Sequence, residues 1–135
     1  MSASDLKVVE TFYEKLNDSG ANYENLEPAL ALIHPEFQLT EPASLPYGGV
    51  YRGREGLMKS TGRAAETLQI DIDKWELWDG GDHVFGMFYC TFHSKVTGRE
   101  LVTTVLQKYR VEDGKIIDVD AYPKDTAAIV DLVRA

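Results

Sequence analysis

The chain has 135 residues, of which 44% are hydrophobic and 27% are charged, and its formal net charge is −8. This length and balance fit one soluble domain over residues 1–135, with a core large enough to be stable without disulfides. The acidic excess argues against nucleic-acid binding, which needs clustered Lys and Arg, and against docking on an anionic membrane.

Signals for export and for membrane insertion are both missing from this sequence. Its one cysteine, Cys90, cannot form an internal disulfide, and lies in a strand-like run where a buried thiol is favoured over a nucleophile. No apolar run reaches the ~18 residues that cross a membrane. The N-terminal residues MSASDLKVVE have neither the basic nor the apolar region of a signal peptide. We therefore expect a cytoplasmic protein.

Helical signals dominate the first half of the chain. Apolar residues recur at helical spacing from Leu6 to Leu16, after a capping residue at Ser4 or Asp5. A short strand, Phe37 to Glu41, and a loop rich in proline and glycine interrupt the helical pattern. The expected helices cover residues 5–17, 23–33 and 53–68.

Strand signals dominate the second half. Side chains alternate, and turn sequences such as Asp79-Gly80-Gly81-Asp82 separate the runs. The expected strands cover residues 69–78, 83–94, 100–111 and 116–122, and a short C-terminal helix follows. Helices before a meander of long antiparallel strands indicate an α+β fold, in which helices lie across a bent sheet and enclose a pocket.

Motifs for nucleotides, metals and nucleophilic serine are missing. The glycines between residues 48 and 56 make neither a GxGxxG pattern nor a phosphate-binding loop. The three histidines, at positions 34, 83 and 93, do not have the spacing of metal ligands. We therefore expect no cofactor and no metal site.

Glu41 is the first candidate catalytic residue. Phe37, Leu39 and Glu41 share one face of the predicted strand, so the carboxylate lies on the side that we expect to be buried. Burial raises the pKa of a carboxyl group towards neutral pH, where it can act as a general base. The alternative is a solvent-facing Glu41, or one paired with Arg52 or Arg54.

Tyr13 and Gln107 are candidate hydrogen-bond donors to an oxyanion. Tyr13 falls at the edge of the apolar stripe of the first helix, and Gln107 shares a strand face with Val105 and Tyr109, opposite Lys108. A base and oxyanion donors in a dry pocket would suit proton abstraction next to a carbonyl group. The alternatives are a core tyrosine and a glutamine with a purely structural hydrogen bond.

Aromatic and histidine side chains are expected to contact the substrate. The residues expected in this role are Tyr47, Trp75, Tyr89, His93 and Tyr109. Trp75, Tyr89 and His93 could instead lie in a subunit interface, because strand alternation alone does not decide which face is which.

The chain resembles the nuclear transport factor two-like superfamily, in particular its SnoaL-like and steroid delta-isomerase-like branch. The matching segments are VVETFYEKLN, LIHPEFQLTEP, YRGREGL and VTGRELVTTVLQKYRVEDGKIIDVDAYPKD, which together run through nearly the whole chain. The resemblance implies a cone-shaped roll, a curved antiparallel sheet wrapped around N-terminal helices with a deep pocket, as a homodimer. It does not fix the function, because this fold carries enzymes and non-enzymes.

The resemblance also implies roles for three residues. Tyr13 matches the tyrosine oxyanion donor of the steroid isomerases, Glu41 before Pro42 matches their aspartate base, and Gln107 matches their protonated aspartate. Glu in place of Asp adds a methylene group, and Gln cannot be acidic, so steroid isomerisation itself is not expected.

Two functions from different classes remain after these observations. The first is a cofactor-free isomerase, cyclase or dehydratase that acts on a small apolar carbonyl compound, with Glu41 as base and with Tyr13 and Gln107 as donors. The second is a non-catalytic protein that binds a small apolar ligand or serves as a dimeric assembly module. A buried Glu41 facing a cavity would favour the enzyme.

Overall fold

Four helices and six strands make up the part of the chain that the structure describes. The structure is a computed structural model, and it describes residues 3–20 and 24–135. In chain order the elements are α1 Ala3–Asn17, α2 Glu27–Leu30, β1 Ile33–Glu41, β2 Gly49–Arg52, α3 Gly53–Thr67, β3 Leu68–Asp79, β4 Val84–Ser94, β5 Glu100–Glu112, β6 Lys115–Pro123 and α4 Thr126–Leu132.

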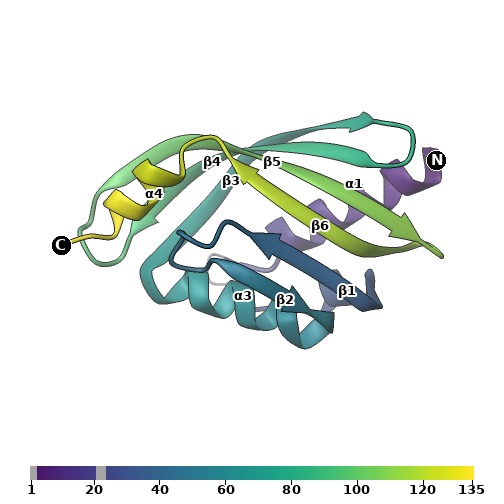
Figure 1. Cartoon of the computed structure of the whole chain (residues 1–135), viewed down its shortest axis with the longest axis horizontal. Helices are drawn as coiled ribbons and strands as arrows, with labels where there is room; N and C mark the ends of the chain where they lie inside the picture. Colours follow the sequence, from purple (N-terminus) through teal and green to yellow (C-terminus); the bar gives the residue numbers. More distant parts are fainter. Residues whose placement is uncertain (1–2, 21–23) are drawn as a thin grey trace.

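The strands form one sheet in the order β2-β1-β6-β5-β4-β3 (Figure 1). β3 to β6 make the expected antiparallel meander, but β1 and β6 are parallel. The expectation of a purely antiparallel sheet is therefore corrected to a mixed sheet. The physical reason is the connection: the chain leaves β1 and returns beside it only after β2, α3 and three long strands, and such a crossover is what parallel pairing requires.

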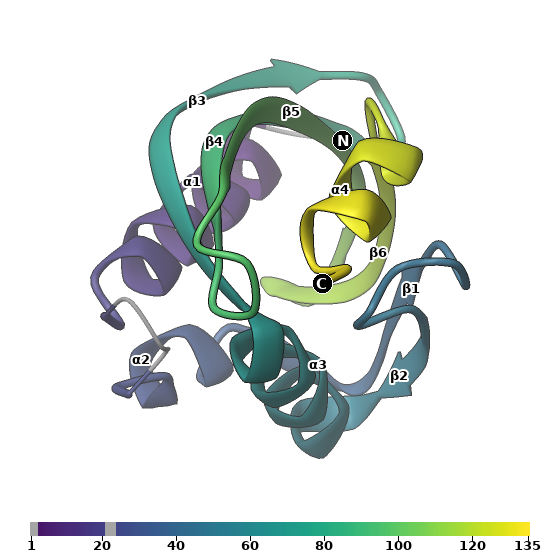
Figure 2. The ribbon, with the colours of Figure 1, turned by 90° about the vertical axis from the view of Figure 1, so that its left-hand side faces the viewer.

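The sheet is strongly bent. Its pairing register shifts between Ile72 and Lys74 in β3, and between Arg110 and Val111 in β5. Bulges of this kind bend a strand and increase its twist. Figure 2 shows β3 to β6 curving into an arc, with α3 across its open side, so the inner face of the sheet and the helices enclose the core.

The alternation of buried and partly exposed side chains along β4 shows which residues point to the inner face of the sheet. Every second residue from Val84 to Ser94 is buried, and the residues between are partly exposed. Phe88, Cys90 and Phe92 therefore point into the core. At one end of the arc, Ile129 and Leu132 of α4 complete the core, and the Asp125 side chain caps this helix by accepting from the Ala128 N–H, so the expected C-terminal helix is confirmed.

The second helix is much shorter than the sequence predicts. The described part of the expected helix over residues 23–33 contains only α2, Glu27–Leu30, and Ile33 already belongs to β1; residue 23 lies outside the described residues. The reason is tertiary pairing, because Ile33 lies opposite Ile116 of β6 and the Ile116 N–H donates to the Leu32 carbonyl at 2.8 Å. Here the hydrogen bonds of the sheet decide the local structure, although the apolar residues are spaced as in a helix.

The glycine-rich loop after β1 contains a short strand that the sequence analysis did not predict. β2 pairs antiparallel with β1, and Gly49 lies opposite Glu41. This pairing fixes both ends of the intervening loop, residues 42–48, next to the end of β1. Among the described residues, no helix is long and apolar enough to cross a membrane.

Candidate functional site

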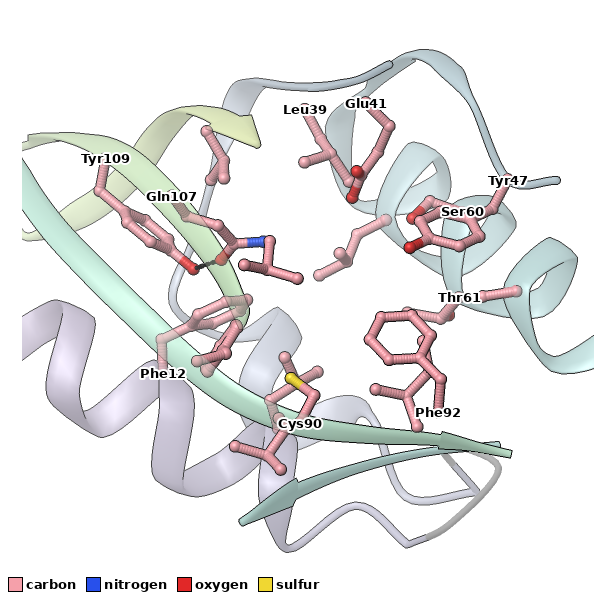
Figure 3. Close-up of a pocket in the computed structure, with 18 of the residues that line it drawn as sticks. Phe12, Leu39, Glu41, Tyr47, Ser60, Thr61, Cys90, Phe92, Gln107 and Tyr109 are labelled. Atoms are coloured by element: carbon pink, nitrogen blue, oxygen red, sulfur yellow. Dashed lines mark hydrogen bonds between the residues drawn. The ribbon is translucent and has the colours of Figure 1, made fainter. Parts of the chain in front are cut away.

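A cavity of about 110 Å³ lies between the inner face of the sheet and the helices. Its wall is largely apolar, with Phe12 and Leu16 from α1, Leu57 from α3 and Phe92 from β4. The polar side chains in the wall are Glu41, Tyr47, Ser60, Thr61, Gln107 and Tyr109. Figure 3 shows Glu41 and Gln107 pointing into the same space from different walls. An apolar cavity with a few convergent polar groups is the usual form of a small-molecule site.

Glu41 ends β1 on the same face as the buried residues Phe37 and Leu39, as the sequence predicts. Removal of the carboxyl group from water raises its pKa to about 8, and the negative charge of Asp120 adds to this rise. No ion pair to Glu41 is found in the described part of the chain, and Arg54 pairs with Glu27 instead at 3.1 Å. Glu41 therefore changes its charge near neutral pH.

Gln107 lies on the inner face of β5, where its amide group reaches the cavity. The Tyr109 hydroxyl donates a short hydrogen bond to Gln107 Oε1. The Tyr13 hydroxyl approaches the same oxygen from the core side at 3.5 Å, at the long end of the range for a hydrogen bond. The carbonyl side of the amide is thus occupied, and the NH₂ group faces the cavity (Figure 3).

Tyr13 lies behind the cavity and is not among the residues that line it. Its side chain is fully buried, its ring packs on Phe88 with centroids 3.9 Å apart, and it meets the Trp75 ring edge to face with centroids 5.9 Å apart. The preceding helical residue, Phe12, lines the cavity instead. Burial raises the pKa of Tyr13 well above its usual value. The structure therefore brings Glu41 and Gln107 together in the cavity and places Tyr13 one layer deeper.

The five expected substrate contacts divide into two groups. Tyr47 and Tyr109 line the cavity. Trp75, Tyr89 and His93 do not: Trp75 packs against Tyr13, and the other two point to the outer face of the sheet.

Tyr89 and His93 are engaged on that outer face. The Tyr89 hydroxyl donates to Glu76 at 2.8 Å, and the two ring nitrogens of His93 contact Asp71 and Glu100 at 2.8 and 2.9 Å. The reason is strand alternation, because even-numbered residues of β4 point inward and both of these are odd.

Two polar residues of the cavity wall, Ser60 and Thr61, were missed by the sequence analysis. They lie on α3 between Leu57 and Ala64, which also line the cavity. The spacing from Leu57 through Ser60 to Ala64 marks one helix face, and this periodicity was the available signal. Small residues on that face leave the space that the cavity occupies.

Cys90 is buried, as the sequence predicts, and it also lines the cavity. Burial raises the pKa of its thiol to about 12, so the group stays neutral near pH 7 and is a weak nucleophile. Among the described residues, no group of three or more His, Cys, Asp or Glu side chains is arranged to hold a metal ion.

Solved structures with the same fold cover almost the whole chain. An NTF2-like protein of unknown function from Burkholderia pseudomallei is 21% identical, with a TM-score of 0.85 and full coverage of both chains. TerC, crystallised with polyporic acid, is 18% identical, with a TM-score of 0.84 over 98% of this chain and 100% of TerC. A candidate polyketide cyclase from Xanthomonas campestris pv. campestris is 17% identical, with a TM-score of 0.78 over 97% of each chain.

These identities establish the fold alone, and a search of curated proteins finds no match. The family comparison goes further. The model of the SnoaL-like domain matches residues 9–119, a segment that contains α1 from residue 9 onward, the cavity-lining helix α3 and every strand except the end of β6. The chain therefore belongs to the SnoaL-like family.

Proposed function

We propose that this protein is a cofactor-independent isomerase, cyclase or dehydratase that removes a proton next to a carbonyl group of a small apolar compound. One observation carries this proposal: a carboxyl group with a pKa of about 8 and an amide donor reach into the same apolar cavity. Such a carboxylate is a stronger base than an exposed glutamate, and it is still available near neutral pH.

The reaction would begin when the Glu41 carboxylate takes a proton from the carbon next to the carbonyl group. The electron pair of the broken C–H bond moves into the new C=C bond, and negative charge develops on the carbonyl oxygen. The Gln107 NH₂ group would donate to that oxygen, and the apolar wall strengthens this interaction by excluding water. Protonated Glu41 can then return the proton to another carbon (isomerase), give it to the oxygen of a second carbonyl group that the enolate attacks (cyclase), or give it to a β-hydroxyl group that leaves as water (dehydratase).

The cavity wall supports an uncharged substrate. Among the described residues that line it there is no Lys, Arg or His, so an anionic substrate would have no partner for its charge there, and burying an unpaired charge is costly. TerC was crystallised with polyporic acid and another structural neighbour is named as a candidate polyketide cyclase. Neither name bears on the charge of the substrate, which we infer from the cavity wall alone.

Exchange of the α-proton for deuterium tests the proposal without knowledge of the product. Small cyclic and aromatic ketones are incubated with the protein in D₂O, and NMR follows loss of the α-proton signal. Wild type should accelerate exchange, Glu41→Gln should lower the rate by about 10²–10⁴-fold, and Gln107→Met by about 10²–10³-fold. Glu66→Gln, an exposed change on α3, is the control and should exchange as wild type does.

Equal exchange rates in wild type and Glu41→Gln would remove Glu41 from the chemistry. Saturable binding of the ketones without any exchange would instead support the second candidate, a non-catalytic ligand-binding protein, since the apolar cavity is common to both functions.

We further propose that the protein forms a homodimer through the outer face of the sheet. Val102 of β5 is 77% exposed and Tyr122 of β6 is 51% exposed, and both point to that face. Tyr122 lies opposite the partly buried Leu106, and Thr104 separates Leu106 from Val102 along β5. Exposed apolar side chains on neighbouring strands are typical of an interface. A second copy of this chain is the occupant that we expect.

A further inference from the structure

Two tyrosine hydroxyl groups meet at one oxygen atom beside the cavity. The Tyr109 hydroxyl donates to Gln107 Oε1, and the Tyr13 hydroxyl points at the same atom from 3.5 Å. Tyr13 comes from α1, while Gln107 and Tyr109 lie two residues apart on the inner face of β5. Figure 3 shows the consequence on the cavity side, where the amide nitrogen of Gln107 faces the open space.

The reverse orientation of the amide would leave a hydroxyl proton without an acceptor. Tyr13 is fully buried and Tyr109 is 1% exposed, so neither hydroxyl group can be satisfied by bulk water. If the NH₂ group faced them, the two hydroxyl groups would have only each other as acceptor, and one proton would stay unpaired.

The backbone opposite Gln107 makes room for this arrangement. Gly86 of β4 pairs with Gln107 of β5, and a Cβ atom at Gly86 would lie 2.1 Å from the Tyr13 hydroxyl oxygen. The rings of Phe88 and Trp75 pack on Tyr13 from other sides. The Tyr13 hydroxyl is therefore held beside Gln107 by packing on several sides.

We propose that Tyr13 and Tyr109 are positioning residues, which fix the Gln107 amide as a hydrogen-bond donor towards the cavity, so that the site selects uncharged ligands with a carbonyl oxygen at this point. The inference deepens the proposed function and rests on it for the catalytic use of the carbonyl group. It assigns Tyr13 a role through Gln107, in place of direct contact with the ligand.

Binding of two ligands of one shape tests the selection. Cyclohexanone and methylenecyclohexane differ only in C=O against C=CH₂, and their affinities for the intact protein are measured by calorimetry at pH 9. At this pH Glu41, with a pKa of about 8, is mostly ionised and does not donate. Wild type should bind the ketone about five- to tenfold more tightly, as expected for one hydrogen bond. In the double variant Tyr13→Phe/Tyr109→Phe, which keeps both rings, the ratio should fall by about twofold or more, because the amide is no longer held in the donor orientation.

Tyr89→Phe is the matched control, because it removes a tyrosine hydroxyl from the outer face, and it should keep the wild-type ratio. Full retention of the ketone preference in the double variant would overturn the inference. A wild-type protein that prefers the ketone but does not exchange its α-proton would instead contradict only the proposed function. The two failures are therefore distinguishable.

A second measurement needs no ligand. The side-chain NH₂ resonances of Gln107 are identified in a ¹⁵N-labelled protein as the pair absent from Gln107→Met. Wild type should give one pair from one amide orientation, and the double variant should give a shifted or exchange-broadened pair because both orientations become accessible. An unchanged pair in the folded double variant would contradict the positioning role, whichever ligand binds.

Discussion

Glu41 links the chemistry of the cavity to the stability of the fold. Its pKa is raised from 4.5 to about 8, first by burial and second by Asp120. Below pH 4.5 the carboxyl group is protonated in both the folded and the unfolded chain. Between pH 4.5 and 8 the unfolded chain ionises first, so the free energy of unfolding falls as pH rises, and the loss is complete above about pH 8.

Glu41→Gln should remove this pH dependence. The pKa difference corresponds to at most roughly 5 kcal/mol between pH 4 and 9, and a neutral glutamine cannot ionise. We therefore expect the variant to be more stable than wild type above pH 8 and to match it more closely near pH 5. Urea unfolding from pH 4 to 9 measures this, with Glu66→Gln as the surface control. Parallel stability curves for wild type and Glu41→Gln would contradict a buried, titrating carboxyl group.

The rate of α-proton exchange should depend on pH through the same ionisation of Glu41. Only ionised Glu41 can accept a proton, so the rate should rise with pH and level off above the pKa of about 8. Wild type is assayed from pH 6 to 9.5 after subtraction of the buffer-catalysed rate. A pH-independent enzymatic rate over this range would mean that another group acts as the base.

At the scale of elements, α3 holds the loop that carries Tyr47. Arg63 donates to the carbonyl groups of Pro46 at 3.1 Å and Gly48 at 2.9 Å, and to the Tyr51 hydroxyl at 2.7 Å. The Tyr51 hydroxyl in turn donates to the Tyr47 carbonyl at 2.8 Å. These bonds satisfy backbone groups of a loop without ladder pairing, and they keep the Tyr47 side chain against the cavity.

Arg63→Met should therefore loosen residues 42–48. Loss of the guanidinium group leaves the Pro46 carbonyl without its donor and the Gly48 carbonyl with only the Tyr51 hydroxyl at 3.1 Å, which costs about 1–3 kcal/mol of stability. Weaker ketone binding should accompany it, because Tyr47 is no longer held in place. Arg54→Met is the control on the same helix: Arg54 forms a half-exposed ion pair with Glu27, worth at most about 1 kcal/mol. Similar losses in both variants would show that Arg63 has no special role.

At the scale of the whole molecule, the bent sheet separates two surfaces with different uses. Its inner face, together with α1 and α3, encloses the cavity. Its outer face presents Val102 and Tyr122 to solvent, and the proposed homodimer would cover them. Ligand binding and self-association would thus use opposite faces of the same strands.

Val102→Lys should weaken the dimer without affecting the cavity. A lysine at the centre of a self-complementary interface faces its own copy or an apolar surface, and desolvation of its charge is unfavourable. Sedimentation velocity should show a shift from dimer to monomer, with ketone binding retained. Val96→Lys, at an exposed residue in the turn between β4 and β5, should leave the oligomeric state unchanged. A monomeric wild type would refute the proposed interface.

Local sequence signals were sufficient for most elements and for the strand faces that carry Glu41 and Gln107. In β1 and β5 one face carries charged or polar residues and the other carries apolar ones; in β5, Lys108 and Arg110 lie opposite Val105 and Tyr109. This alternation correctly placed Glu41 and Gln107 on the inner face. In β4 large apolar side chains occupy both faces, for example Phe85 and Phe88, so alternation alone could not show that Tyr89 and His93 point outward.

What the sequence by itself determined is the family, the order of most elements and the faces of amphipathic strands, because these depend on spacing between near neighbours in the chain. Only the tertiary structure decided that β1 pairs in parallel with β6, that Ile33 belongs to a strand and that Tyr13 stands behind Gln107. Each of these depends on contacts between residues 80 or more positions apart, and no local pattern encodes such a contact.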